Sequence, residues 1–436
     1  MKINAIIAEY NPLHKGHEYL INKGKEITGA DYTIVVMSGN YVQRGEPAVM
    51  DKSIRTEAAL LAGADLVIEL PLYYSLASAE YFAKGAVALI DKLGVVDNLI
   101  FGCETDNISL LEDIAFLSLD YERELYELIS KYMSEGHSYP KAESIAITDI
   151  IEKLSDEEKD KYQELVCYGK DDIVKILSAP NSTLAICYIK SIISLNSNLE
   201  PVAITRITSE HHDSSLGALS SSAIRKELLE KNYEPIREQV SEDVYELMAD
   251  NVGVNYPVCI DDYSDILLYK LRSLVYGNGA RLKAQGILAL TEYLDVSEDL
   301  AGRIINMLPE FRSFAQFIAI LKTKSITYSH ISRALMHIIL DIKKTNATKY
   351  IANDFSLFAR VLGFYNGSSE LMSVIKDNSE IPFISKLADA EDIIEDKLVL
   401  KHLFETINAD ELYSGNVALG FSCEYVPEMS KKIVIL

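Results

Sequence analysis

Apolar and polar positions alternate in blocks over the first hundred residues of the chain. Short apolar runs ended by polar residues or proline predict buried strands at 2–8, 32–37, 66–69 and 98–102. Between them, apolar residues recur at helical spacing and predict helices at 17–27, 51–62 and 78–93. Strands and helices that alternate with short connections predict a Rossmann-like, doubly wound parallel sheet of the α/β class. Ligands of such sheets bind beyond the carboxyl ends of the strands.

The pattern changes twice further along the chain. It is charged and helical from 109 to about 177, which we interpret as a helical insertion at about 108–178. Alternation then returns, with a helix at 183–195, a fifth strand at 201–206 and a helix at 222–231. Beyond 236 strand signals are scarce, and helices are predicted at 262–275, 280–293, 297–307, 309–322, 327–343, 353–363, 368–376 and 391–408, with a short β piece within 417–436. We therefore divide the chain into an α/β domain at 1–235 and a mainly α-helical domain at 236–436.

Composition and charge narrow the class of protein. The 436 residues carry a formal net charge of -23, which argues against a protein that coats nucleic acid nonspecifically. The five cysteines are widely spaced and form no CxxC pair, so we expect a reducing cytoplasm, no disulfide framework and no metal site. We expect no membrane association, because no signal-peptide pattern is visible and no apolar run reaches the roughly 18 residues of a membrane span.

A polar motif with two histidines follows the first predicted strand. Residues 9–17 read Glu-Tyr-Asn-Pro-Leu-His-Lys-Gly-His, an HxGH pattern at the start of the first helix. Gly16 would let the backbone approach a phosphate, and the helix N-terminus would offer free N–H groups. His14 and His17 could stabilise charge on a leaving pyrophosphate. The alternative is a strand–turn–helix junction with incidental histidines, but the preceding Asn-Pro and the position after the first strand favour a catalytic role.

A serine-rich motif follows the fifth predicted strand. Residues 220–225 read Ser-Ser-Ser-Ala-Ile-Arg, so the hydroxyls of Ser221 and Ser222 start a helix and Arg225 lies one turn further on. By itself this is an ordinary capped helix. Together with the HxGH motif it forms a pair that would clamp one triphosphate from both halves of the sheet.

These two motifs resemble those of the nucleotidyltransferase superfamily, which includes pantetheine-phosphate adenylyltransferases and is related to class I aminoacyl-tRNA synthetases. A fuller set resembles the bacterial tRNA(Met) cytidine acetate ligases. That set comprises Ala-Glu-Tyr-Asn-Pro at 8–12, Gly-Asn-Tyr-Val-Gln-Arg-Gly-Glu-Pro-Ala at 39–48, Asp51-Lys52, Phe101-Gly102, Pro180-Asn181 and Thr205-Arg206. The resemblance covers essentially the whole chain, although the helical half matches only in character.

The resemblance implies a two-step reaction in which ATP and acetate form acetyl-adenylate, and the acetyl group passes to N4 of the wobble cytidine (C34) of elongator tRNA(Met). It also implies that Gly102, Asn181 and Arg206 hold the nucleotide, together with the whole 7–20 segment. That segment comprises Ile7, Ala8, Glu9, Tyr10, Asn11, Pro12, Leu13, His14, Lys15, Gly16, His17, Glu18, Tyr19 and Leu20. Leu13 stands where a phenylalanine is common in the family. Mg²⁺ is expected with ATP, held mostly by phosphate oxygens.

The residue types suit these roles. Gly102 would leave room for adenine or ribose, Asn181 can hydrogen-bond a base or ribose edge, and Arg206 offers a fork for phosphate or ribose. Lys52 could reach a phosphate as a point charge or be a solvated lysine at a helix start. Two further patterns are interpreted as incidental. His211-His212-Asp213 is a loop near the site, and Glu-Met-Ser-Lys-Lys at 428–432 resembles the KMSKS loop of the synthetases only by coincidence.

An RNA substrate requires a basic surface on this acidic chain. The window 303–349 holds eight basic residues against only Glu310 and Asp341, a local excess of six. We interpret it as a face that contacts tRNA phosphates, the alternative being an ordinary solvated helix surface. Its basic residues are Arg303, Arg312, Lys322, Lys324, Arg333, Lys343, Lys344 and Lys349.

Two other functions compete with the acetate ligase. A small-molecule adenylyltransferase of cofactor metabolism would not need a helical half of about 200 residues. A nucleotide sensor or RNA-binding module without activity would not need intact histidines and both phosphate motifs. The residues alone do not name acetate, and the oligomeric state is left open.

Overall fold

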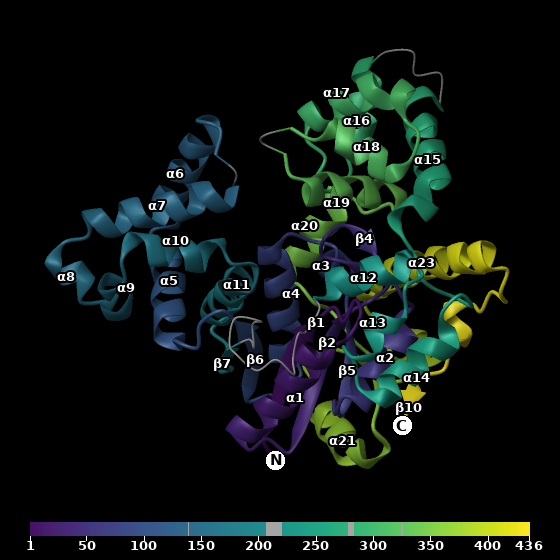
Figure 1. Cartoon of the computed structure of the whole chain (residues 1–436), viewed down its shortest axis with the longest axis horizontal. Helices are drawn as coiled ribbons and strands as arrows, with labels where there is room; N and C mark the ends of the chain where they lie inside the picture. The colour runs from purple at the N-terminus through teal and green to yellow at the C-terminus, as the bar shows by residue number, and fades with distance from the viewer. Residues whose placement is uncertain (138, 206–219, 278–282, 324–325) are drawn as a thin grey trace.

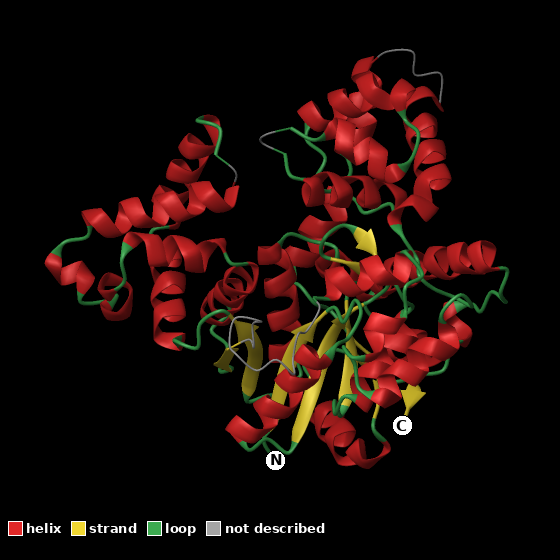
Figure 2. Ribbon diagram, in the orientation of Figure 1, coloured by secondary structure: helices red, strands yellow, loops and turns green. Residues whose placement is uncertain are grey.

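The computed structural model describes residues 1–137, 139–205, 220–277, 283–323 and 326–436. At its centre lies an eight-stranded sheet in the order β10-β8-β5-β2-β1-β6-β7, with β9 paired to β8 (Figure 1, Figure 2). The strands from β5 to β7 in this order are parallel, and β8 runs antiparallel to β5. The strands are β1 Ile3–Ala8, β2 Tyr32–Ser38, β5 Leu66–Leu70, β6 Asn98–Cys103, β7 Glu200–Thr205, β8 Ala359–Phe364, β9 Phe383–Ile384 and β10 Val434–Ile435. The doubly wound parallel sheet predicted from the sequence is confirmed.

The central strands are apolar on both faces because helices cover both sides. Ala5, Ile34 and Val36 belong to one core with helices α4 (Ala79–Lys92) and α11 (Pro180–Ser194). The alternate positions Ile6 and Val35 belong to a second core with α1 (Lys15–Thr28) and α2 (Lys52–Leu61). Such two-sided burial is typical of parallel strands. The chain passes from β5 at one side of β1 to β6 at its other side, so the topological switch point lies between β1 and β6.

Helices fill the connections of the first half. A short hairpin of β3 (Tyr41–Val42) and β4 (Glu46–Pro47) follows β2. Between β6 and α11 the helices α5 to α10 extend away from the sheet (Figure 1). The remaining α-helices up to residue 251 are α3 Leu72–Ser75, α5 Ile108–Asp120, α6 Glu122–Ser134, α7 Tyr139–Lys153, α8 Asp156–Lys159, α9 Gln163–Cys167, α10 Lys170–Ser178, α12 Ser221–Leu229, α13 Glu234–Arg237 and α14 Glu242–Asn251.

The second half is mainly helical but also contributes to the sheet. Its α-helices are α15 Ser264–Tyr276, α16 Lys283–Thr291, α17 Glu298–Met307, α18 Phe314–Leu321, α19 Tyr328–Ile339, α20 Lys344–Ala352, α21 Ser369–Asn378, α22 Ala390–Ile393 and α23 Lys397–Phe421, and its 3-10 helices are Ile260–Tyr263, Leu308–Glu310, Asn366–Ser368, Leu387–Asp389 and Glu428–Ser430. The helix predicted at 353–363 is wrong, because this stretch enters strand β8. A short buried apolar run fits a core helix and a core strand equally well. The boundary at residue 235 stays an interpretation.

The helical region and the sheet region share buried side chains. Tyr41 of the hairpin and Leu72, Tyr73 and Leu76 around α3 are buried in the core formed by α15 to α20. Within the part of the chain that the structure describes, no single helix has the length and apolar character of a membrane span; one bent pair, Asp171–Ser178 with Pro180–Ser194, meets those criteria when taken together.

Candidate active site

The HxGH motif forms the start of α1 through its own side chains. His14 is the N-cap, and its Nδ1 accepts the Gly16 N–H at 3.0 Å. The Nδ1 of His17 accepts the His14 N–H at 3.2 Å, and the two rings stack with centroids 3.9 Å apart. Because each Nδ1 is an acceptor, the neutral imidazoles carry their proton on Nε2. The fold therefore fixes the tautomer in which Nε2–H is the donor.

The first N–H groups of α1 have protein partners, which corrects the expectation of free donors. Lys15 N–H donates to the Gln239 carbonyl at 2.8 Å, and His17 N–H donates to the His14 carbonyl at 2.8 Å. Gly16 N–H is held by the His14 ring, and a Cβ at Gly16 would lie 2.9 Å from that ring. Glycine is thus required here for the approach of His14. Phosphate recognition at this helix start would rest on side chains and on the helix dipole.

The serine motif docks directly on the HxGH loop. Arg225 Nη1 donates to the Asn11 carbonyl at 2.6 Å, and Ser221 Oγ donates to the Pro12 carbonyl at 3.2 Å. Arg225 Nη2 also donates to Ser222 Oγ at 3.1 Å. Ser220, not Ser221 or Ser222, caps α12 by accepting the Ala223 N–H. Two motifs more than 200 residues apart in the chain therefore contact each other, and the triphosphate clamp expected of the pair stays a prediction.

A buried arginine that the sequence analysis missed holds the strand ends together. Arg55, on α2, is fully buried and donates to the carbonyls of Glu9 and Ser38, at 2.7 and 2.9 Å. It also contacts the carbonyls of Gly39 and Met50. The signal that could have revealed this role is the position of Arg55, one turn into a helix that is otherwise largely buried. Its guanidinium joins the carboxyl ends of β1 and β2, next to the candidate site.

The Glu9 side chain is held by the hairpin. Its Oε1 accepts the Gln43 N–H at 2.8 Å. Burial raises the pKa of the Glu9 carboxyl, although the Gln43 N–H and the guanidinium groups of Arg225, Arg44 and Arg55 lower it in part. Within the 7–20 segment, Leu13 packs into a core, so this position shapes the loop from inside.

Gly102 and Asn181 lie on the other side of the switch point. Gly102 is near the carboxyl end of β6, next to Ile204 of β7, and Asn181 is in the first turn of α11. Glu104 connects them, because it follows β6 and its Oε1 accepts from Asn181 Nδ2 at 2.7 Å. Partial burial disfavours the charge of Glu104, but hydrogen bonds from Asn181 and Ser182 outweigh it and lower its pKa. Arg206 and His211-His212-Asp213 lie outside the described residues.

Lys52 does not reach toward the phosphate motifs, and it is not solvated. Its side chain is 2% exposed, and Nζ lies 2.7 Å from Glu69 Oε1 and 2.8 Å from Glu428 Oε1, with Asp410 also in contact. Arg360 of β8 joins the same carboxylates, Glu69 at 2.9 Å and Glu428 at 2.6 Å. A long-range network of this kind has no local signal in the sequence. The prediction that Lys52 contacts a phosphate is therefore wrong.

The KMSKS-like segment is part of this network. Lys431 pairs with Asp51 at 3.0 Å and with Glu428 at 3.1 Å. The segment lines a pocket of about 390 Å³ together with Lys52 and Arg360. Lys431 is thus held by carboxylates at the far side of the sheet from β6, where it supports the fold.

The basic window divides into structural and exposed side chains. Arg303 donates to the carbonyls of Ile320 and Leu321, and Arg333 pairs with Asp295 at 3.2 Å. Lys343 pairs with Glu292 at 3.2 Å and lies over the Tyr293 ring, and Lys344 donates to the Val296 carbonyl. The exposed members are Arg312, Lys322 and Lys349, and Lys324 lies outside the described residues.

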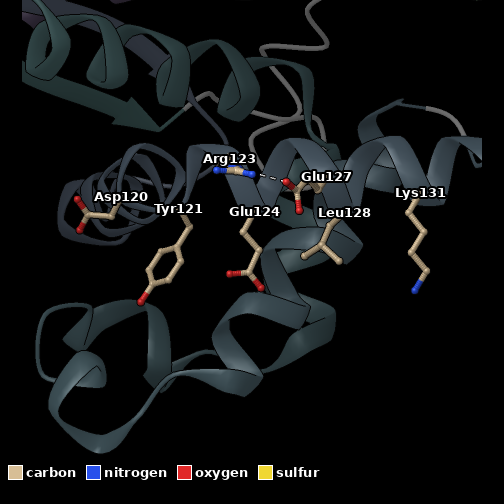
Figure 3. Close-up of a pocket in the computed structure, with 7 residues that line it drawn as sticks. All are labelled: Asp120, Tyr121, Arg123, Glu124, Glu127, Leu128 and Lys131. Atoms are coloured by element: carbon tan, nitrogen blue, oxygen red, sulfur yellow. Dashed lines mark hydrogen bonds and ion pairs between the residues drawn. The ribbon is translucent and has the colours of Figure 1, made fainter.

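A second hollow lies in the helical insertion. It is an open groove of about 670 Å³ along α6, lined by Asp120, Tyr121, Arg123, Glu124, Glu127, Leu128 and Lys131 (Figure 3). Both acidic and basic side chains line it, and Arg123 pairs with Glu127 at 3.3 Å. None of the residues predicted for the nucleotide site lines this groove.

Comparison with known proteins agrees with this geometry. The family model described as HIGH Nucleotidyl Transferase matches residues 1–420. The tRNA(Met) cytidine acetate ligase of Clostridium kluyveri is 36% identical and covers 94% of this chain and 95% of its own length. That of Thermoanaerobacter sp. is 35% identical over 93% of this chain and 94% of its own length. The crystal structure of Thermotoga maritima TmcAL bound with alpha-thio ATP covers all of both chains, with a TM-score of 0.85 and 27% identity. The chain therefore belongs to the HIGH nucleotidyl transferase family and, within it, to the tRNA(Met) cytidine acetate ligases.

Proposed function

We propose that this protein is an ATP-dependent ligase that acetylates N4 of the wobble cytidine (C34) of elongator tRNA(Met). In the first step an acetate oxygen attacks the α-phosphorus of ATP, and pyrophosphate leaves. In the second step the cytidine N4 attacks the acetyl carbonyl, AMP leaves with the bonding electron pair, and the N4 proton is released. The relatives named tRNA(Met) cytidine acetate ligase support this assignment over nearly the full length.

One observation carries the proposal. The HxGH loop and the serine motif interlock, with Arg225 on the Asn11 carbonyl at 2.6 Å and Ser221 on the Pro12 carbonyl at 3.2 Å. In this arrangement the Nε2–H groups of His14 and His17 are donors suited to charge that develops on the leaving pyrophosphate. Serine hydroxyls and the Arg225 guanidinium suit the same phosphates from the other side.

The nucleotide would lie across the switch point between β1 and β6. The 7–20 segment would hold the phosphates, and Gly102, Asn181 and Arg206 would hold ribose and adenine. Among the described residues no group of three His, Cys, Asp or Glu side chains is arranged to hold a metal ion. An Mg²⁺ ion that accompanies ATP would be held mainly by the phosphates, which is its usual mode in ATP sites, and it would screen their charge.

The partners and location are part of the proposal. Elongator tRNA(Met) and acetate are the expected substrates, and a cytoplasmic location is expected from five cysteines that are all free thiols in the structure. A small-molecule adenylyltransferase is less well supported, because the relatives that match along nearly the whole chain, helical half included, are named as tRNA ligases.

Pyrophosphate exchange tests the first step. The purified protein should catalyse exchange between ATP and labelled pyrophosphate with acetate, and larger carboxylic acids should be excluded sterically. Adding tRNA with labelled acetate should yield acetylated tRNA without acetyl-CoA. If acetyl-CoA supports acetylation of the tRNA, and ATP with acetate does not, the ligase assignment is wrong.

A further inference from the structure

Glu104 is an exposed residue whose two carboxylate oxygens are nevertheless both held. Oε1 accepts from Asn181 Nδ2 at 2.7 Å. Oε2 accepts from the Ser182 N–H at 2.8 Å and from Ser182 Oγ at 2.7 Å. A surface glutamate with no role samples several rotamers, whereas this one is bound at three points to the start of α11.

The same contacts complete the start of α11. The N-cap residue, Ala179, makes no side-chain cap hydrogen bond, and Pro180 lacks an N–H. Glu104, the residue that follows β6, supplies the missing acceptor. It thereby fixes α11, which carries Asn181, against the strand that carries Gly102.

The bond to Glu104 also determines which way the Asn181 amide is turned. A carboxylate only accepts hydrogen bonds, so the amide group that faces it must be the nitrogen. The carbonyl oxygen is then directed away from Glu104. An asparagine held in this way keeps its oxygen as the acceptor on the side of the amide that faces away from Glu104.

We propose that Glu104 is a positioning residue of the nucleotide site, which orients Asn181 so that its oxygen accepts a hydrogen bond from a donor on ATP. The inference rests on the proposed function only in that ATP is the ligand. ATP has two kinds of donor that fit, the 6-amino group of adenine and the ribose hydroxyls.

Glu104→Gln is the informative variant. Its amide nitrogen can donate to the Asn181 oxygen while its own oxygen still accepts from Ser182, so the Asn181 amide would turn over and present its nitrogen. We expect ATP affinity, measured by isothermal titration calorimetry without acetate or tRNA, to fall about tenfold, as for the loss of one hydrogen bond at a binding site. Glu104→Asp keeps a pure acceptor and should recover part of the affinity. Glu122→Gln, an exposed substitution at the start of α6, is the matched control and should bind ATP like the original protein.

A double-mutant cycle distinguishes a positioning role of Glu104 from a direct contact between Glu104 and ATP or an effect on the folding of α11. If Glu104 acts through Asn181, the variant with both Glu104→Gln and Asn181→Ala should bind ATP no more weakly than Asn181→Ala alone. Thermal unfolding of each variant shows whether α11 remains folded. Losses that add in the cycle would overturn the inference, because Glu104 would then act independently of Asn181.

Nucleotide analogues identify the donor. If the donor is the 6-amino group, Glu104→Gln should lose affinity for ATP and gain relative affinity for ITP, which carries an acceptor there. If the donor is a ribose hydroxyl, the preference for ATP over 2′-deoxy-ATP or 3′-deoxy-ATP should shrink instead.

An unchanged ATP affinity of Glu104→Gln beside a weakened Asn181→Ala would overturn the inference and leave the proposed function intact. If Asn181→Ala also binds ATP normally, the assignment of Asn181 to the site fails together with it.

Discussion

At the scale of single residues, the chemistry depends on side chains that also build the local fold. His17 is an example, because its Nδ1 accepts the His14 N–H in the capping box of α1 while its Nε2–H is the candidate donor to pyrophosphate. Replacing it by alanine would remove both functions. Glutamine at this position can still accept the His14 N–H, as in an ordinary capping box, but lacks the imidazole donor.

We therefore predict different outcomes for two His17 variants. Both His17→Ala and His17→Gln should lower the rate of pyrophosphate exchange by about 10²–10³, the usual effect of losing one donor to developing charge. Only His17→Ala should also lose about 1 kcal/mol of stability, the typical value of an N-cap interaction. Exchange kinetics and urea unfolding measure the two effects. Near-normal exchange in folded His17→Gln would contradict a catalytic role.

Arg55 gives a second prediction at this scale. Arg55→Met keeps the apolar volume but leaves the carbonyls of Glu9, Ser38, Gly39 and Met50 without their donor. We expect a loss of roughly 3 kcal/mol or more in urea unfolding, because each buried acceptor left without a partner costs about 1–3 kcal/mol. Arg55→Lys should remain nearly as destabilised, because an ammonium group cannot span carbonyls that a planar guanidinium joins. A stability within about 1 kcal/mol of the original for Arg55→Met would show that water satisfies these carbonyls.

Sequence analysis identified the site residues that belong to short contiguous motifs. It missed residues whose hydrogen-bond partners lie on other helices and strands. His14, His17, Ser221 and Arg225 belong to short motifs, and the structure brings them together. Arg55 and Glu104 were missed, since their partners lie on other elements. Lys52 was assigned wrongly for the same reason, because its carboxylate partners are 17 to 376 residues away in sequence.

At the scale of elements, the hairpin after β2 connects the site to the helical region. Gln43 N–H holds Glu9 at one side of the hairpin, and the Gly45 carbonyl accepts from Ser332 Oγ of α19 at 2.7 Å on the other. Gly45 has φ 86°, and a Cβ there would lie 2.4 Å from the Arg333 backbone nitrogen. Neither the hairpin nor strand β8 was predicted, because two-residue strands and buried apolar runs carry little periodicity.

Gly45→Ala should separate the hairpin from α19. We expect it to cost about 1–3 kcal/mol beyond the backbone term, because the contact is with main-chain atoms that cannot rotate away. Gly29→Ala is a matched control, since Gly29 has φ 67° and a Cβ added there would have no atom within 4 Å, so only the left-handed backbone cost of roughly 1–2 kcal/mol remains. Urea unfolding of both variants gives the difference. Equal losses of stability in the two variants would show that the hairpin can move away from α19 without a loss of stability.

At the scale of the whole molecule, the proposed function requires an acidic protein to bind a polyanion. The net charge of -23 repels RNA at long range, so binding requires a surface where exposed cations dominate. Within the 303–349 window, Arg303, Arg333, Lys343 and Lys344 hold the helices together through carbonyls and carboxylates. Reversing their charge would disturb the fold as well as the surface. Arg312, Lys322 and Lys349 are exposed and are the appropriate residues to change.

We predict that reversing Arg312, Lys322 and Lys349 to glutamate weakens tRNA binding strongly and leaves acetate-dependent pyrophosphate exchange intact. Phosphate binding releases counterions, so the slope of log affinity against log salt should fall by about one for each phosphate that the variant no longer neutralises. Electrophoretic shifts at several salt concentrations measure the slope, and exchange assays on the same variant test the nucleotide site. The matched control reverses Lys131, Lys153 and Lys161, exposed lysines of the helical insertion, and changes the net charge equally. If the control loses as much affinity as the variant, net charge alone sets binding and the window has no special role; unchanged affinity in both would place the RNA on another surface.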